Sequence, residues 1–564
     1  MITRFVVGLM AVACGDALLS RPAYSSEGAA THCSEPQDVG RYFSKKRYVV
    51  VPLPVYEAAR TELPSPIYDY KPVWVDMYWK AWALAFKNFR EPSPGSGFVS
   101  QFIDAAFNEN IFLWDSSFMT MFTNFGAPVV PGISTLDNFY AKQHDDGEIC
   151  REIVRDRGLC YSPWVNHDCE PLVSHYGWLD QFASEPLHYS PVTYQGRDLP
   201  TANPVFTLEA LNHPILAWAE LESYRVTGDK GRLEIVWSPL VNYYNALRNY
   251  LRQGNGLYMT DWASMDNSPR NQYLRGGGAA IDTSSEMVLF AHNLASIADI
   301  LGKHAESRRY TREADDLARS INRLMWEPDR GFYFDLTLDG KHVPVKTIAA
   351  YWTLIGGVAS PKQAEKLVRE LLNPKTFGRP NPVPTLAADE PQYDAAGGYW
   401  RGSVWAPTTT MIIRGLEEYG YRALAREFAV RYLDLVADVY GKTGTIWENY
   451  SPEAREPGRP ARPDFVGWSG IGPIMYFLEY GIGLQPNAAR NELLWELRSG
   501  GRQGCERFRF AGHVSSLVAE PVPGSRDKYH IAVESDGGFT LNVVHDGTSA
   551  IFQIKKGHQE FEVH

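Results

Sequence analysis

The sequence predicts a mainly α-helical domain followed by a small antiparallel β-domain. Between about residues 73 and 483, apolar residues recur at helical spacing, beginning with the run that contains Trp74. After about residue 495, apolar and polar residues alternate instead, and turn residues separate the alternating runs. We therefore expect a helical domain over residues 73–490 and a β-domain over residues 491–564.

Two pairs of neighbouring helices can be placed directly from the apolar pattern. Residues 287–298 and 310–324 each carry one apolar stripe, and residues 411–416 and 424–435 form a second such pair. Short breaks between long amphipathic helices indicate antiparallel helical hairpins. About a dozen helical segments could close into a ring of hairpins or stack into an open solenoid, and periodicity alone does not choose between them.

The two ends of the chain have other patterns. In the expected β-domain, residues 529–533 and 539–543 alternate, and Asp536-Gly537-Gly538 supplies a turn between them. This domain holds no cluster of residues suited to catalysis, so we expect it to cap and stabilise the helical domain. Residues 27–72 are Pro-rich and are expected to be irregular.

Residues 1–26 resemble a signal peptide. Arg4 is followed by a short apolar run, then by small residues and a Ser-rich stretch. We therefore expect an exported protein, periplasmic or extracellular. Cys14 follows Ala-Val-Ala, which half-resembles a lipoprotein cleavage box, but Ala11 stands where Leu is usual. Lipidation of Cys14 is the less favoured alternative.

Three further cysteines, Cys150, Cys160 and Cys169, lie close together in the sequence. In an exported chain we expect one local disulfide among them, and their spacing leaves the pairing open. No paired C-x-x-C or His spacing accompanies them, which argues against a zinc site.

Composition excludes some partners. The net charge of −11 argues against a nucleic-acid partner, because phosphate binding needs clustered cations. No run of about 18 apolar residues follows the N-terminus, so we expect no transmembrane span in the mature chain. The 16 Trp and 31 Tyr suit stacking on sugars, but aromatic rings also fill cores. The oligomeric state is left open.

Four connections between helices mix Trp, carboxylates and Gly in a way that neither a helix nor a strand requires. They are residues 110–118, 260–270, 397–405 and 445–453. Loops held by a rigid scaffold are where chemistry tends to be located. Cleavage of a glycosidic bond needs one protonated carboxyl to give a proton to the leaving oxygen. It also needs one ionised carboxylate to activate water or attack the sugar.

Asp266 and Glu448 are the candidate pair of carboxyls. Each stands among aromatic residues and Gly or Pro, and apolar surroundings raise the pKa of a carboxyl, which suits an acid. The alternative for Asp266 is that it caps a helix beginning near residues 268–269. Other carboxylates compete with Glu448 for the second role: Asp261, Glu453 and Asp464.

Other residues of these segments suit sugar binding. Arg401, next to Trp400, could donate paired hydrogen bonds to sugar hydroxyls or to a carboxylate, or could form a structural salt bridge. Trp114 and Asp115 could hold a sugar by stacking and hydrogen bonding. They could equally be a core Trp beside a helix cap, and the residues alone leave these alternatives open.

At these segments the sequence resembles glycoside hydrolase family 63, nearest to its mannosylglycerate-hydrolase-like branch. Residues 447–453, WENYSPE, match the family's segment, and residues 464–470 match its D-F-x-G-W-S-G. Residues 398–405 are similar to G-Y-W-R-G-P-x-W, with Ser403 in place of Pro. Residues 265–270 are similar to the family's M-D-N-S-P-R, although Ser264 precedes them where Gly is usual.

The resemblance covers roughly residues 75 to 485 and implies an (α/α)6 barrel, a six-hairpin toroid, with the small C-terminal antiparallel β-domain. It implies inversion at the anomeric carbon, with Asp266 as general acid and Glu448 as general base, their carboxyls about 6.5–9.5 Å apart. The segment at Trp114 and Asp115 resembles the W-D-S that lines the sugar pocket. The substrate-binding residues expected are Trp114, Asp115, Trp262, Arg270, Tyr399, Trp400, Arg401, Trp405 and Trp447.

The implied substrate is a small carbohydrate: an α-glucoside, an α-mannoside linked to a small acid such as glycerate, or trehalose. The mechanism requires no cofactor. A structural calcium ion is compatible with exported relatives, although the sequence has no EF-hand-like spacing.

Three alternative functions are a trehalase-like hydrolase, an (α/α)6 polysaccharide lyase and a non-catalytic glycan-binding protein. A lyase would need a Tyr or His base and a cation that binds uronates. A binding protein would keep the aromatic residues but lose one carboxylate, and the presence of both Asp266 and Glu448 argues against it.

Overall fold

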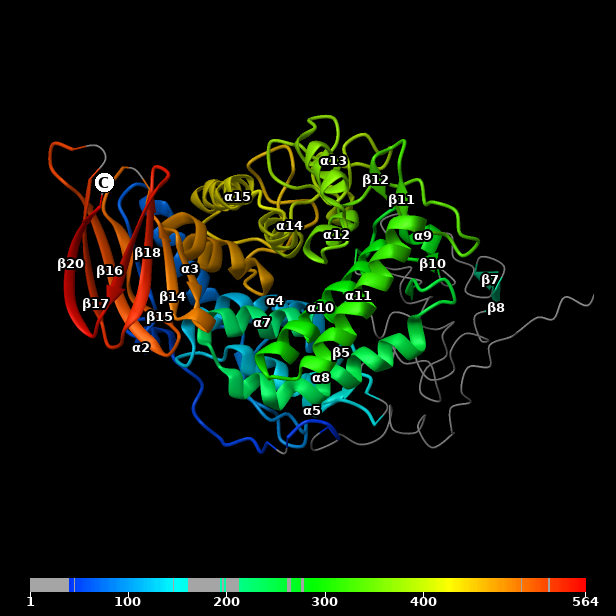
Figure 1. The fold of residues 1–564 in the computed structure, drawn as a ribbon, viewed down its shortest axis with the longest axis horizontal. Helices are drawn as coiled ribbons and strands as arrows, with labels where there is room; N and C mark the ends of the chain where they lie inside the picture. The colour runs from blue at the N-terminus through cyan, green and yellow to red at the C-terminus, as the bar shows by residue number, and fades with distance from the viewer. Residues whose placement is uncertain are drawn as a thin grey trace, which may run out of the picture.

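The computed structural model describes residues 40–44, 46–145, 147–160, 193–194, 197–198, 213–260, 265–274, 278–498, 500–525 and 528–563. The predicted signal peptide with Cys14, as well as Cys169 and Trp262, lies outside these residues. The described chain is mainly helical and ends in β-structure that is mostly antiparallel, as predicted, although residues 492–496 pair in parallel with residues 540–544 (Figure 1).

One set of helices forms the interior of the helical domain. Each member contacts the next, α14 and η9 (Gly472–Ile482) through the hydrogen bond between Thr410 and Tyr476. Both η9 and η8 (Trp468–Ile471) contact α4, so the contacts return to their starting point. In order they are α4 (Leu113–Thr123), α7 (Leu216–Thr227), α10 (Ile281–Ile300), α12 (Trp352–Ile355), α14 (Ala406–Glu418) and the π-helix η9 (Gly472–Ile482).

A second set of helices lies outside the first. α11 (His304–Leu324) is typical of them: it buries one stripe of residues at helical spacing, among them Tyr310 and Ile321, and its other faces are solvated. The outer helices are α3 (Pro72–Ala85), α5 (Asp137–Ala141), α8 (Lys230–Leu251), α11 (His304–Leu324), α13 (Pro361–Leu372) and α15 (Arg422–Thr443). α10 packs on α11 and α14 on α15, so both helix pairs predicted from the sequence are confirmed.

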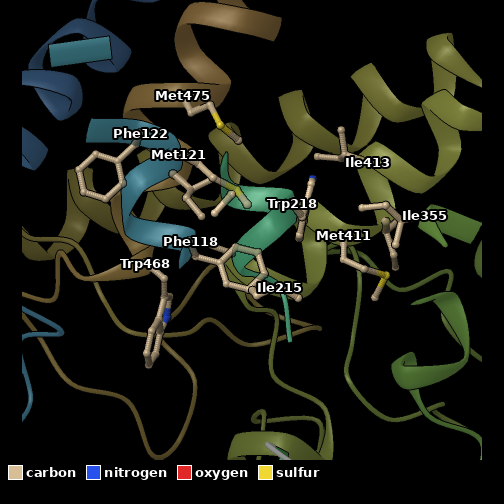
Figure 2. Close-up of a cluster of buried hydrophobic side chains, with 14 of the residues drawn as sticks. Phe118, Met121, Phe122, Ile215, Trp218, Ile355, Met411, Ile413, Trp468 and Met475 are labelled. Carbon is tan, nitrogen blue, oxygen red and sulfur yellow. The ribbon is translucent and has the colours of Figure 1, made fainter. Parts of the chain in front are cut away.

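The inner helices meet in an apolar core. Figure 2 shows part of it, where Phe118 and Met121 of α4 lie beside Trp218 of α7. The rings of Phe118 and Trp218 are 5.6 Å apart and meet edge to face. Since Phe118 is fully buried, its replacement by Ala should cost about 3–5 kcal/mol of unfolding free energy.

The C-terminal domain consists of two sheets. The first has the strand order β1-β15-β16-β17-β20 and the second β13-β14-β18-β19. Burial alternates along β17 and β18, as the sequence predicts. The strands are β13 (Leu484–Asn487), β14 (Glu492–Glu496), β15 (Gln503–Phe510), β16 (His513–Pro521), β17 (Tyr529–Ser535), β18 (Phe539–His545), β19 (Thr548–Ile554) and β20 (Gly557–Val563).

Part of the segment 27–72 is not irregular, which corrects the expectation. It contains the short helix α2 (Tyr56–Ala59) and strand β1 (Ser65–Tyr68). β1 pairs antiparallel with β15 and so completes the edge of the C-terminal sheet. The pairing could not be read from the sequence because its two strands are more than 400 positions apart.

Short strands lie in the connections between helices and position the site. β4 (Asn110–Phe112) leads directly into α4 and pairs with β5 (Glu152–Val154), which pairs with β6 (Leu159–Cys160). The others are β2 (Phe89–Arg90), β3 (Phe102–Ile103), β7 (Thr193–Tyr194), β8 (Arg197–Asp198), β9 (Met259–Thr260), β10 (Gly278–Ala279), β11 (Trp326–Glu327) and β12 (Phe332–Tyr333). No helix of the described part of the chain is long and apolar enough to cross a membrane.

Candidate active site

The structure brings the four predicted segments together. The Trp114 ring lies 6.3 Å from that of Trp400 and 6.4 Å from that of Trp468. The side chain of Asn267, next to Asp266, bonds the 397–405 segment, and that segment bonds Glu448. Residues from four distant parts of the sequence therefore form one site.

Asp266 has the electrostatic character of a proton donor. It lies in a turn between β9 and the short helix α9 (Asn271–Leu274) and is partly exposed. Burial raises the pKa of Asp266 from 3.8 to about 7; the guanidinium of Arg151 opposes this, and the charges of Glu448 and Glu152 add to it. A carboxyl with a pKa near 7 is substantially protonated at neutral pH and can give up its proton.

Glu448 is held by a donor at each oxygen. It is 3% exposed. Tyr399 Oη donates to Oε1 at 3.2 Å, and the backbone N–H of Arg462 donates to Oε2 at 3.2 Å. Burial raises the pKa of Glu448 above its ordinary value, although Arg462 and the Tyr399 hydroxyl act to lower it. Donors at both oxygens fix the orientation of the carboxylate and favour its ionised form, which suits a base.

Asn267 joins the segment of Asp266 to the 397–405 segment, whose Tyr399 bonds Glu448. Asn267 Nδ2 donates to Gly398 O at 3.0 Å, and its Oδ1 accepts from Trp400 N at 2.9 Å. Tyr399, between these contacts, has a φ of 64°, in the left-handed region. Such a conformation costs a non-glycine residue about 1 kcal/mol or more and is concentrated at functional sites.

Asp115 stands in the first turn of α4 and is 6% exposed. Burial raises its pKa well above the usual value, Arg151 opposes the shift, and Glu152 and Asp266 add to it. The N–H of Leu113 donates to Arg151 O at 2.8 Å, so β5 lies against the start of α4. The charges of Arg151 and Glu152 thus act on both Asp115 and Asp266.

Arg151 and Glu152 are the site residues that the sequence did not reveal. They reach the site because β5 pairs with β4, in the register Phe112↔Glu152. Asn110 Nδ2 donates to Glu152 Oε1 at 2.6 Å and fixes that carboxylate. No motif surrounds residues 150–153, so only the tertiary strand pairing could have identified them.

Arg270 has a different place from the one expected. It is fully buried and pairs with Asp282 and, at 3.0 Å, with Asp335. This enclosure leaves the guanidinium no surface to offer to a sugar. Arg270 therefore supports the loop of Asp266 from behind, which corrects its expected role in substrate binding.

The aromatic residues divide into a wall and its support. Trp405 is fully buried and stacks on Trp400 with 4.3 Å between ring centroids, so it supports Trp400 and cannot meet a substrate. Trp114, Tyr399 and Trp447 are partly exposed and could contact a substrate, so these three residues form the aromatic wall. Arg401 is also partly exposed.

The competing carboxylate Glu453 is occupied elsewhere. Arg379 donates to both of its oxygens, at 2.6 and 2.9 Å, and Tyr393 Oη donates to Oε1 at 2.6 Å. Asp464 is exposed and accepts from Thr445. Asp261 lies outside the described residues. Glu448 is thus the carboxylate of this group that faces Tyr399 and influences Asp266.

The cysteines near β5 are free thiols. Because both Cys150 and Cys160 are free, the predicted local disulfide among Cys150, Cys160 and Cys169 is wrong; Cys169 itself lies outside the described residues. His144 Nε2 lies 3.1 Å from Cys160 Sγ. Within the described residues, no three His, Cys, Asp or Glu side chains are arranged to hold a metal ion.

Comparison with known proteins identifies the family. Residues 202–469 match the mannosylglycerate hydrolase MGH1-like glycoside hydrolase domain. An uncharacterized protein of Borreliella burgdorferi is 30% identical over 352 residues, which cover 60% of this chain and 73% of that protein. The mannosylglycerate hydrolase of Rubrobacter radiotolerans is 32% identical over 146 residues, 25% of this chain and 32% of that enzyme.

Solved structures agree on the fold. The GH63 mannosylglycerate hydrolase from Thermus thermophilus, in complex with glucose, has a TM-score of 0.52 at 17% identity. The match covers 71% of this chain and 99% of that one. At this identity the likeness concerns the fold alone. The sequence matches show that the chain belongs to the MGH1-like glycoside hydrolases, and its fold agrees with that of a GH63 enzyme.

Proposed function

We propose that the protein is an inverting hydrolase of small α-glycosides, with Asp266 as general acid and Glu448 as general base. The observation that carries this proposal is the difference between the two carboxyls. Asp266 has a pKa of about 7, whereas Glu448 accepts a hydrogen bond at each oxygen. Asp266 thereby retains its proton up to about neutral pH, and the hydrogen bonds at both oxygens of Glu448 favour its ionised form, as the reaction needs.

The reaction is a single displacement. Asp266 gives its proton to the glycosidic oxygen as the bond from that oxygen to the anomeric carbon breaks. Glu448 takes a proton from a water molecule, whose oxygen forms the new bond on the opposite face of the sugar. The expected separation of the two carboxyls, about 6.5–9.5 Å, leaves room for this water.

The closed series of contacts among the inner helices supports an (α/α)6 barrel as the scaffold. Several of these helices place buried polar residues in their first turns. α4 contributes Asp115 and Ser116, and α14 contributes Thr408 and Thr409. The resemblance of residues 1–26 to a signal peptide supports an exported enzyme.

We further propose that the leaving group is a small carboxylic acid of the glycerate type. The general acid protonates the leaving oxygen, so the leaving group lies on the side of Asp266. Arg151 is the cation with the largest influence on the pKa of both Asp266 and Asp115. A guanidinium in this position suits recognition of a carboxylate, and several relatives carry the name mannosylglycerate hydrolase.

Hydrolysis of matched substrates tests this function. α-Mannosylglycerate and α-glucosylglycerate should be hydrolysed, and the neutral analogue α-mannosylglycerol should be hydrolysed less efficiently. Arg151→Gln should lower kcat/KM for the glycerates about tenfold or more, because a hydrogen bond to a charged group is lost, and should affect the neutral analogue less. Arg157→Gln, an exposed change in the same hairpin, is the control.

Two results would contradict the proposal. If the neutral analogue or trehalose is hydrolysed and the glycerates are not, the leaving group is wrongly assigned. If no α-glycoside of the set is hydrolysed, the assignment of an α-glycosidase fails.

A further inference from the structure

A buried pair of side chains, His213 and Glu286, lies beside the aromatic wall and has no part in the proposed mechanism. His213 is 2% exposed and Glu286 is fully buried. His213 Nδ1 and Glu286 Oε1 are 3.1 Å apart. The His213 ring lies 5.7 Å from the Trp114 ring, between centroids. His213 therefore joins α10 to the aromatic residue expected to meet the sugar.

The backbone fixes this imidazole. His213 has a φ of 62°, in the left-handed region that non-glycine residues rarely adopt. Its carbonyl accepts from the N–H of Ile215, just before α7 begins. Ile215 in turn lies near Phe118 in the core drawn in Figure 2. Strained residues of this kind persist where the surroundings determine them closely, and they are concentrated at functional sites.

The charged groups that face His213 are mostly acidic. Glu286 and Asp282 reach it from α10, and Arg270 pairs with Asp282. Trp114, from α4, carries no charge. Burial raises the pKa of Glu286, and His213 opposes this shift. Although burial acts to raise the pKa of Asp282, Arg270 and then His213 lower it. His213 thus faces two buried carboxyl groups, one of which also pairs with Arg270.

We propose that His213 is a positioning residue for the sugar-binding wall: its hydrogen bond to Glu286 fixes the imidazole, and the imidazole fixes the ring of Trp114. This rests on the proposed function, because it takes Trp114 to bind the sugar. Ring contacts are favourable only in particular orientations, so a loosened Trp114 weakens sugar binding. The proton transfers of Asp266 and Glu448 do not pass through His213. Removal of the His213 side chain should therefore raise KM and leave kcat nearly unchanged.

Kinetics of three variants test this role. His213→Ala should raise KM about tenfold and leave kcat within about twofold, as expected for a lost aromatic contact. His213→Asn tolerates the left-handed backbone and its amide can bond Glu286, but it lacks the ring, so it should raise KM to a similar extent. His342→Ala is the matched control: His342 Nδ1 lies 3.1 Å from Glu327 Oε2, and its Nε2 lies 2.9 Å from Leu324 O at the end of α11. It should leave both constants unchanged.

Other outcomes would overturn the role. Unchanged KM in His213→Ala, a KM in His213→Asn equal to that of the unaltered enzyme, or an equal fall of kcat in either variant would contradict the positioning of Trp114 by the imidazole ring. If His213→Ala does not fold, Glu286→Gln, which removes the charged acceptor but keeps the volume, should raise KM, and an unchanged KM would contradict the proposal.

A double-mutant cycle separates this proposal from the proposed function. If the unaltered enzyme hydrolyses no α-glycoside, the proposed function fails. The contact itself is then tested by the free energies of unfolding of His213→Ala, Trp114→Phe and the double variant. Non-additive effects support the contact between the two rings, and additive effects overturn it.

Discussion

The hydroxyl of Tyr399 donates a hydrogen bond to Oε1 of Glu448, at 3.2 Å. The residues on either side of Tyr399, Gly398 and Trp400, are bonded by the amide of Asn267, the neighbour of Asp266. The candidate acid and the candidate base are thus connected through one three-residue segment. A disturbance of this segment should affect both carboxyls.

Tyr399→Phe should lower kcat about ten- to a hundredfold, because one hydrogen bond to a charged group is lost. The hydroxyl lowers the pKa of Glu448, so its removal raises that pKa. The acidic limb of the pH profile of kcat/KM should move to higher pH. Tyr393→Phe is the control, since Tyr393 makes the same kind of bond to Glu453. Equal effects of the two changes would contradict the positioning of the base by Tyr399.

Activity should fall as the pH rises through about 7, because Asp266, with a pKa of about 7, then loses the proton that it must donate. Arg151 lowers the pKa of Asp266. Arg151→Gln should therefore move the basic limb of kcat/KM to higher pH. An unmoved limb would show that another group sets it.

Asp266→Asn should reduce kcat about a hundred- to ten-thousandfold, the usual contribution of a general acid. The variant should keep its thermal unfolding transition, because the change is isosteric. Surviving turnover on a substrate with a poor leaving group would show that Asp266 is not the acid.

Arg270→Met should cost about 3–5 kcal/mol of unfolding free energy, because Asp282 and Asp335 are left buried without their cation. Arg319→Met, which breaks the exposed pair with Asp316 on α11, is the control and should leave the stability unchanged. Denaturant unfolding measures both. A small effect of Arg270→Met would contradict the role of this residue as the support of the acid loop.

Stability should fall in acid through Glu222. Although burial favours the protonated form, Arg414 and Arg225 hold the pKa of Glu222 at about 2, against an ordinary value of 4.5. The folded pKa is the lower one, so the contribution is fully present above pH 4.5 and is lost as the pH falls towards 2. The loss is about 3 kcal/mol. Glu222→Gln should flatten the acid slope of unfolding free energy, and an unchanged slope would contradict this account.

The sequence was a good guide to what local pattern and motif order determine. The helix pairs α10–α11 and α14–α15 and the alternating strands follow from periodicity, which depends only on neighbouring residues. The motifs that contain Asp266 and Glu448 stand in loops, and the structure brings those loops together.

The sequence was a poor guide to long-range pairing. Arg151 reaches the site only because β5 pairs with β4, and β1 belongs to the C-terminal sheet only because it pairs with β15. The buried ion pairs of Arg270 were equally hidden, because an Arg beside a catalytic motif looks the same in sequence whether it faces a sugar or a carboxylate. Tertiary contacts decide these roles.

The anomeric form of the first product tests the central claim most directly. Proton NMR during the first minutes of α-mannosylglycerate hydrolysis should show β-mannose appearing first and α-mannose only later by mutarotation, because water attacks the face opposite the leaving group. Initial release of α-mannose would mean retention of configuration. It would contradict the single displacement and the assignment of Glu448 as a base that activates water.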